Sequence, residues 1–203
     1  MHIGIDFDNT IVSYDALFHK VAREQDLVPA ETPLNKVAVR DHLRRVGQED
    51  RWTQMQGYVY GARMDEALAY EGVIDFIRRS KATGHEITIV SHKTRYPFIG
   101  PRYDLHAAAR EWIEHHLLWG GQALLSSDRV FFELTKEDKL ARIGACACEA
   151  FIDDLPEILL ASDFPSDASK LLFDPEDNHA ELGRRDLRRF RSWQQIEEHF
   201  SAS

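Results

Sequence analysis

Two carboxylates stand two positions apart at the end of an apolar run near the N-terminus. The run covers residues 3–5 and breaks into Asp6 and Asp8, which are followed by Asn9 and Thr10. Residues i and i+2 of a strand point the same way, so these carboxylates would repel each other without a cation or a shared proton. A strand that ends at Asp6 and then turns would direct both groups into one polar pocket, where Mg²⁺ finds the oxygen ligands it prefers. The alternative is a solvated turn after an edge strand.

Three further apolar runs end in polar side chains of complementary kinds. These side chains are Ser91 after residues 87–90, Lys136 and Lys139 after residues 130–134, and Asp153 and Asp154 after residues 150–152. If the strands are parallel, their carboxyl ends share one edge of the sheet, where α/β proteins bind ligands. A hydroxyl, an ammonium group and two pairs of carboxylates would then converge there. Alternatively, Ser91 bonds to backbone at a strand end, and the Asp153-Asp154 pair caps the helix that Pro156 begins.

Short apolar runs with β character alternate with helical patterns along most of the chain. This alternation predicts an α/β fold, with a Rossmann-like, mostly parallel sheet and helices on both of its faces. The expected strands are 2–7, 86–91, 128–132, 150–153 and 170–173, and the expected helices are 72–83, 104–118, 136–143, 155–161 and 192–200. The five arginines between 184 and 191 are typical of a solvated helix face.

The segment from residue 13 to about residue 70 interrupts this alternation. It contains up to four helical patterns, at 14–25, 36–46, 51–60 and 64–69, separated by Pro29, Pro33 and Gly47. We therefore predict two domains: an α/β core formed by residues 1–12 and 71–203, and a small helical cap formed by residues 13–70. An insertion directly after the first strand is expected at the ligand-binding edge of the sheet.

The composition excludes several classes of partner. The 203 residues are 43% hydrophobic with a net charge of −9, which supports a sizeable core and argues against a nucleic-acid polymer or an anionic membrane as partner. The two cysteines, Cys146 and Cys148, match neither a zinc pattern nor a redox pair. No leader-like segment or membrane-length apolar run occurs, so we expect a cytoplasmic protein. The sequence indicates no oligomeric state.

The order of the polar strand ends resembles the haloacid dehalogenase-like (HAD) superfamily, in particular its phosphatase branch. The run from Asp6 to Thr10 is similar to the first motif of that family, D-x-D-x-T after an apolar strand. Ser91 resembles the second motif, a lysine that opens a helix the third, and Asp153-Asp154 the fourth. These motifs extend from about residue 3 to residue 157, and the predicted cap lies at a common position for the family, between the first two.

The resemblance implies Mg²⁺-dependent hydrolysis of a phosphate monoester of a small metabolite, such as a sugar phosphate or a nucleotide. Asp6 would be the nucleophile that forms an aspartyl-phosphate, and Asp8 the general acid and base. Dehalogenases of the superfamily have no acidic residue at the position of Asp8. Two alternatives remain open: a HAD-like domain that binds or regulates without turnover, and a phosphotransferase that uses the same aspartyl-phosphate.

The remaining motif residues acquire roles from the same resemblance. Ser91 would donate a hydrogen bond to a phosphoryl oxygen, and Lys139, with Lys136 as the alternative, would hold the nucleophile and the phosphate together. The Mg²⁺ ligands would be the carboxylates of Asp6 and Asp154 and the backbone carbonyl of Asp8, with Asp153 acting through water. Thr10 would fix the turn through its hydroxyl.

The segment after Ser91 is the first candidate for substrate selection. It mixes cations, aromatic side chains and two prolines. Lys93, Arg95 and Arg102 are candidates for an anionic substrate group, and Tyr96 and Tyr103 for packing a sugar or base. The alternative is a rigid connection with solvated cations. Similar candidates occur in the cap, where the alternative is that the aromatic side chains pack the cap's own helices; they are Arg40, Arg44, Trp52, Tyr58, Tyr60 and Arg63.

Overall fold

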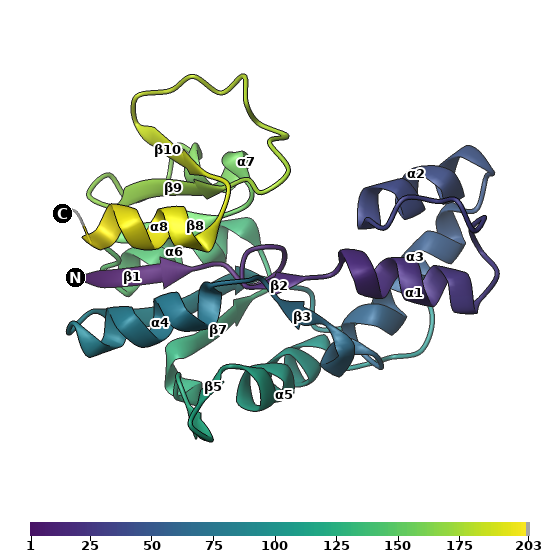
Figure 1. Ribbon diagram of the computed structural model, residues 1–203, viewed down its shortest axis with the longest axis horizontal. Coiled ribbons are helices and arrows are strands. Elements are labelled where there is room, and N and C mark those ends of the chain that lie inside the picture. The colour runs from purple at the N-terminus through teal and green to yellow at the C-terminus, as the bar shows by residue number, and fades with distance from the viewer. Residues whose placement is uncertain (202–203) are drawn as a thin grey trace. The chain divides into compact units, whose positions relative to one another are not determined.

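The computed structural model describes residues 1–201, which fold into two compact units (Figure 1). The first unit comprises Met1–Ile11, Ala69–Lys93 and the chain from Leu117 onward. The second unit comprises Val12–Leu68 and Thr94–His116. No helix within residues 1–201 combines the length and the apolar character that crossing a membrane requires.

The first unit is built on a six-stranded sheet in which every strand pair is parallel. The strand order is β10-β9-β8-β1-β4-β7. In chain order the strands are β1 (His2–Ile5), β4 (Glu86–His92), β7 (Val130–Glu133), β8 (Ala150–Asp153), β9 (Ser169–Phe173) and β10 (Leu187–Phe190). The predicted α/β fold with a parallel sheet is therefore confirmed.

Helices cover both faces of this sheet, also as predicted. They are α4 (Val73–Ala82), α6 (Lys136–Ala145), α7 (Pro156–Leu159) and α8 (Trp193–Ser201). The chain crosses from β1 to β4 in one direction and returns from β7 to β8, so right-handed crossovers put α4 and α6 on opposite faces. Helix α8 packs on α4, while α7 packs on β8 and β9, and in Figure 1 α4 and α8 lie nearer the viewer than α6.

The face under α6 and α7 carries a continuous apolar core around the middle of β1 and β8. Its members include Leu140 and Ile143 from α6 and Phe151 from β8, all buried. Gly4 of β1 lies against this core, because a Cβ built there would meet the ring of Phe151 and, at 2.8 Å, the Sγ of Cys148. The absence of a side chain at residue 4 thus lets Phe151 fill the space between strand and helix.

Strand β10 corrects one prediction. The arginine-rich segment 184–191 is not a helix face: Leu187–Phe190 forms an edge strand parallel to β9, with Arg188 opposite Leu171 and Phe190 opposite Phe173. Charged side chains are tolerated on an edge strand, whose outer side meets solvent. Arg189 also donates hydrogen bonds to Asp174 and Asp177, which ties the strand to the preceding loop.

A short hairpin follows α5 and was not predicted. Strands β5 (Leu118–Trp119) and β6 (Gln122–Ala123) pair antiparallel, and the expected helix 104–118 ends at His116. Gly120 and Gly121 both have positive φ, at 58° and 77°, as a two-residue hairpin turn of type I′ requires.

The second unit is helical. It contains α1 (Asp15–Glu24), α2 (Lys36–Arg45), α3 (Glu49–Tyr60), the 3₁₀ helix η1 (Met64–Glu66) and α5 (Leu105–His116). Two short strands, β2 (Val12–Ser13) and β3 (Leu68–Ala69), pair with each other. Three of the helices expected within residues 13–70 are present as α1, α2 and α3, whereas the expected helix 64–69 is the 3₁₀ helix η1 followed by β3. The assignment of this segment as a cap stays a prediction.

Aromatic side chains hold the helices of this unit together. Tyr14, the N-cap residue of α1, and Phe18 of α1 make edge-to-face contacts with Tyr60 of α3, at ring-centroid distances of 4.8 and 5.5 Å. The Nζ of Lys36, at the start of α2, lies 5.4 to 5.9 Å from the centres of these three rings. Helix α2 is therefore joined to α1 and α3 by cation–π as well as apolar contacts.

Substituting Gly4 tests the packing of β1 against Phe151 and Cys148. We expect Gly4→Ala to lower the free energy of unfolding by about 1–3 kcal/mol, because the added methyl group must displace Phe151 or Cys148. Gly183→Ala is the matched control, since a Cβ there meets no atom within 4 Å. Urea denaturation of both variants measures the difference, and equal stabilities would contradict the close packing.

Candidate active site

The register of β1 and β8 brings two of the predicted carboxylates side by side. Ile5 pairs with Ile152, and the backbone N–H of Asp6 donates to the carbonyl of Ile152 at 2.9 Å. Asp6 and Asp153 are each one residue further along, at the carboxyl ends of their strands. Both carboxylates are buried, with exposures of 4% and 0%. The strand pairing alone therefore places two acidic groups at one edge of the sheet.

The turn after Asp6 is fixed at several points. The N–H of Ile11 donates to the carbonyl of Phe7 at 3.0 Å, and Asn9 adopts a positive φ of 59°. The buried hydroxyl of Thr10 donates to Oδ1 of Asp154 at 3.3 Å. Thr10 thus links the turn after β1 to the fourth predicted motif, after β8.

Lys139 lies between the two strand-end carboxylates. It is 1% exposed, and its Nζ is 2.6 Å from Oδ1 of Asp6 and 2.6 Å from Oδ2 of Asp153. The lysine stands one turn inside α6, whose N-cap is Thr135, which accepts a hydrogen bond from the N–H of Asp138. Lys136 instead donates to the backbone carbonyl of Glu157 at 2.7 Å. Of the two candidate lysines, the structure brings Lys139 to the carboxylates.

Burial perturbs all three groups of this cluster. It raises the pKa of Asp6 to about 7, although the ammonium of Lys139 acts in the opposite direction. Burial likewise raises the pKa of Asp153, against the effect of Lys139. The pKa of Lys139 rises despite burial, because Asp153 and Asp6 stabilise its charged form. One ammonium shared by two buried carboxylates leaves a surplus negative charge, which a proton or a cation neutralises.

The donor set at this position fits a hard divalent cation. Asp6, Asp153 and Asp154 each offer an oxygen, and these oxygens lie within 4.8 Å of one another. Carboxylate oxygens and surplus negative charge are what Mg²⁺ requires of a protein, since it keeps several of its own water ligands.

Ser91, at the end of β4, has a hydroxyl that lacks a hydrogen-bond partner within residues 1–201. The side chain is 1% exposed, and its Oγ is buried. A buried hydroxyl without a partner is costly, so such a group is often a binding group for a ligand. The alternative in which this hydroxyl caps backbone is not what the structure shows.

The predicted substrate-binding cations lie in different places. Lys93 is buried in the first unit and donates to both carboxylate oxygens of Asp8, at 2.9 Å each. Arg95 belongs to the second unit, where it is exposed and donates to Asp104 at 3.1 Å. Lys93 was expected to bind an anionic substrate group, and its pairing with Asp8 was not predicted. Its signal was the i, i+2 spacing from Ser91, which puts both side chains on one side of the extended chain.

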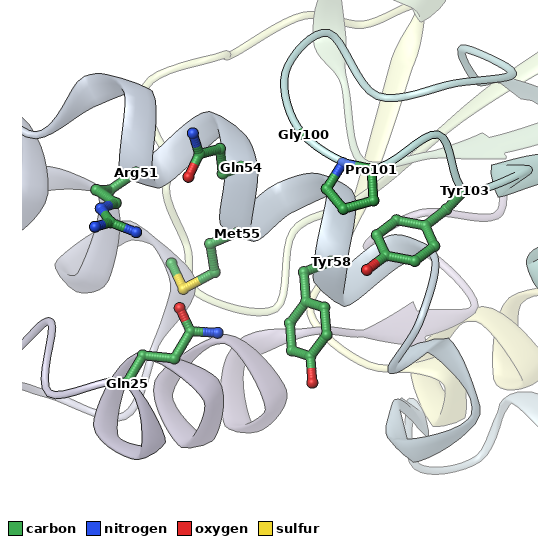
Figure 2. A pocket seen from close by; sticks show the side chains of 8 residues that line it. All are labelled: Gln25, Arg51, Gln54, Met55, Tyr58, Gly100, Pro101 and Tyr103. Atoms are coloured by element: carbon green, nitrogen blue, oxygen red, sulfur yellow. The ribbon is translucent and has the colours of Figure 1, made fainter.

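The second unit contains a pocket of about 330 Å³, shown in Figure 2. Gln25, Arg51, Gln54, Met55, Tyr58, Gly100, Pro101 and Tyr103 line it. The rings of Tyr58 and Tyr103, both candidates for packing a substrate, are 6.5 Å apart with their planes at 56°. Planes at that angle cannot sandwich a flat ligand. The residues with predicted catalytic roles lie in the first unit, so the candidate active site is built there.

Comparisons with known proteins identify the fold. A HAD family hydrolase from Deinococcus radiodurans R1, solved with bound phosphate and sodium, has a TM-score of 0.58 at 13% identity, over 99% of this chain and 95% of that one. A β-phosphoglucomutase from Pyrococcus sp. strain ST 04 has a TM-score of 0.57 at 14% identity, over 98% and 97% of the two chains. A structure described as a dehalogenase has a TM-score of 0.56 at 14% identity, over 98% and 96%.

No protein-family model and no curated protein sequence matches the chain. At these identities the solved structures establish the fold alone. The chain has the fold of HAD-superfamily hydrolases over nearly its whole length, in agreement with the resemblance seen in the sequence.

The surplus negative charge of the Asp6–Lys139–Asp153 cluster predicts that a rise in pH lowers the stability of the protein and that a divalent cation raises it. Because the pKa of Asp6 is raised from 3.8 to about 7 on folding, the folded state holds the extra proton. The metal-free protein should therefore lose stability, on the order of a few kcal/mol, as pH rises from about 4 to about 7. A divalent cation bound by these carboxylates would take the place of that proton, so added Mg²⁺ should raise the melting temperature more at pH about 8 than at pH about 5.

Thermal unfolding in EDTA and in Mg²⁺ at the two pH values measures both effects. Asp154→Asn should reduce the Mg²⁺ effect, while Asp163→Asn, a change at an exposed aspartate, should leave it unchanged. The same Mg²⁺-induced shift at both pH values would count against a site that includes Asp6.

Proposed function

We propose that this protein is a Mg²⁺-dependent phosphatase that hydrolyses a phosphate monoester of a small metabolite. The observation that carries the proposal is the buried Asp6–Lys139–Asp153 cluster at the carboxyl edge of a parallel sheet. Its electrostatics suit a bound anion and cation together, and the fold is that of HAD-superfamily hydrolases. The neighbour from D. radiodurans holds a phosphate, which supports an anionic substrate of this class.

Asp6 is the nucleophile in this proposal. An oxygen of its carboxylate attacks phosphorus, an aspartyl-phosphate forms, and the bond between phosphorus and the ester oxygen breaks. Lys139 holds the other carboxylate oxygen at 2.6 Å, which fixes the attacking group and offsets the charge of the phosphoryl oxygens. Ser91 supplies the hydroxyl that donates to one of those oxygens. Water then attacks the aspartyl-phosphate, which releases inorganic phosphate and restores Asp6.

Asp8 carries protons in both steps. It gives a proton to the ester oxygen as the first bond breaks, and it takes one from the attacking water in the second step. A halide leaves without a proton, so a carboxyl group at this position favours phosphate esters over halogenated acids. This argument separates the proposal from the dehalogenase activity that the same fold supports.

Mg²⁺ fits the cluster of the Asp6, Asp153 and Asp154 carboxylates. In this proposal the carboxylates of Asp6 and Asp154 and the backbone carbonyl of Asp8 would bind the ion directly. Asp153 would bind it through water. When bound, the ion neutralises charge on the phosphoryl group. A small phosphorylated metabolite, such as a sugar phosphate or a nucleotide, is the substrate class, and residues 13–70 are the cap that would select it.

A phosphotransferase is the second candidate, because a β-phosphoglucomutase shares the fold. It would form the same aspartyl-phosphate and then pass the phosphoryl group to a hydroxyl of another molecule. Product analysis separates the two: a phosphatase releases inorganic phosphate from each ester it consumes.

Phosphate release from a panel of phosphorylated metabolites, with Mg²⁺ and with EDTA, tests the proposed function. We expect release that needs Mg²⁺ and falls by about 1,000-fold or more in Asp6→Asn, because the amide is not a nucleophile. Asp163→Asn should retain the wild-type rate. Equal release by Asp6→Asn, or none from any ester by a folded wild type, would refute it.

Ser91→Ala tests the unpartnered hydroxyl. Loss of one hydrogen bond to a charged phosphoryl group should lower kcat/KM by about 10- to 100-fold. Stability should stay the same or rise, because the hydroxyl has no partner to lose. Enzyme assays and urea denaturation check both, and a destabilised variant with full activity would show a structural role instead.

A further inference from the structure

Lys93 is fixed in place through both its side chain and its backbone. Its side chain is 5% exposed, and its Nζ lies 5.8 Å from the centre of the Phe7 ring. Its backbone N–H donates to the carbonyl of Glu133 at 2.8 Å, which continues the pairing of β4 with β7 beyond His92. Both ends of the residue are thus fixed by the core of the first unit.

The ammonium of Lys93 contacts both oxygens of a single carboxylate. Its Nζ is 2.9 Å from Oδ1 and 2.9 Å from Oδ2 of Asp8. A cation shared symmetrically by the two oxygens fixes the rotation of the carboxylate as well as its position. The Asp8 side chain is 23% exposed, so one side of this restrained group remains open to solvent.

The geometry points to Lys93 as the residue that positions Asp8 for proton transfer. This inference rests on the proposed function, in which Asp8 exchanges protons with the leaving group and with water. Lys93 acts through Asp8 and needs no contact with the substrate, which distinguishes this role from the anion-gripping role expected from the sequence.

Ser91 and Lys93, both near the end of β4, therefore have different roles in this proposal. Ser91 has a free hydroxyl for the phosphoryl group, whereas Lys93, two residues later, is paired with Asp8. In the reaction the proton of Asp8 moves to the ester oxygen as its bond to phosphorus breaks, and the attacking water returns a proton to Asp8. A carboxylate that rotates freely performs both transfers more slowly, because proton transfer depends on the alignment of donor and acceptor.

The dependence on the leaving group tests this role. Dinitrophenolate leaves without a proton, so kcat/KM for dinitrophenyl phosphate does not require Asp8 as an acid. The alkoxide of an alkyl phosphate does require it. We expect Lys93→Met to change kcat/KM for dinitrophenyl phosphate by less than about 3-fold, and to lower it about 100-fold for the best alkyl phosphate of the metabolite panel.

Two comparisons sharpen the result. In an Asp8→Asn background, Lys93→Met should cause no further loss with the alkyl phosphate, because its effect is already removed. Lys170→Met is the matched control, since Lys170 is also partly buried and near a carboxylate, 3.6 Å from Asp186, and it should leave both rates unchanged. Equal losses on both esters with a raised KM would mean that Lys93 binds the phosphoryl group, and the inference would be overturned.

A stability measurement separates this inference from the proposed function. If the wild type releases phosphate from neither ester, the proposed function fails, whereas the pairing can still be tested. Lys93→Met and Asp8→Asn should then be non-additive in their urea midpoints, with the double variant no less stable than the less stable single variant. Additive shifts would show that Lys93 does not hold Asp8.

Discussion

The candidate site depends on one ammonium group held between two buried carboxylates. Removing charges from water is expensive unless each gains a partner, and Lys139 pairs with Asp6 and Asp153 at 2.6 Å. The three residues come from β1, α6 and β8, so this arrangement exists only when the parallel sheet and the helix on its face are both in place. Because one positive charge faces two negative charges, the folded site keeps a surplus negative charge that a bound cation can neutralise. The same charge balance therefore affects both the stability of the fold and the proposed chemistry.

The parallel sheet positions the site residues more precisely than a loop could. Each strand end is fixed by the register of its neighbours: Ile5 pairs with both Ile89 and Ile152, so Asp6 follows beside Asp153 and one residue before the level of Ser91. The chain crosses from β1 to β4 on one side of β1, and a later crossover from β7 returns it to β8 on the other side of β1. The site therefore lies at the point where the strand order reverses, which is where open α/β sheets bind ligands.

Much of this was predictable from the sequence, because the strands that carry the site are short apolar runs with polar ends. The parallel sheet and its strands β1, β4, β7, β8 and β9 follow from that pattern. The edge strand β10 was missed, since Leu187–Phe190 has two arginines in four residues and only its pairing with β9 makes it a strand. The choice between Lys136 and Lys139 needed the helix phase. The Lys93–Asp8 pair joins residues 85 positions apart, so the spacing of Lys93 from Ser91 gives the side on which Lys93 lies but does not identify its partner.

The two aspartates that follow β1, Asp6 and Asp8, carry like charges close together, and each is paired with a separate lysine. Asp6 is paired with Lys139 from α6, whereas Asp8 is paired with Lys93 from the end of β4. A single cation between them, as the spacing alone suggested, would tie both carboxylates to one task. Separate partners leave Asp6 close to Asp154 and, in the proposed function, held for attack, and they leave Asp8 restrained but partly open to solvent. Two carboxylates of the same kind are thus given different surroundings, which is the physical condition for a nucleophile and a proton carrier to work side by side.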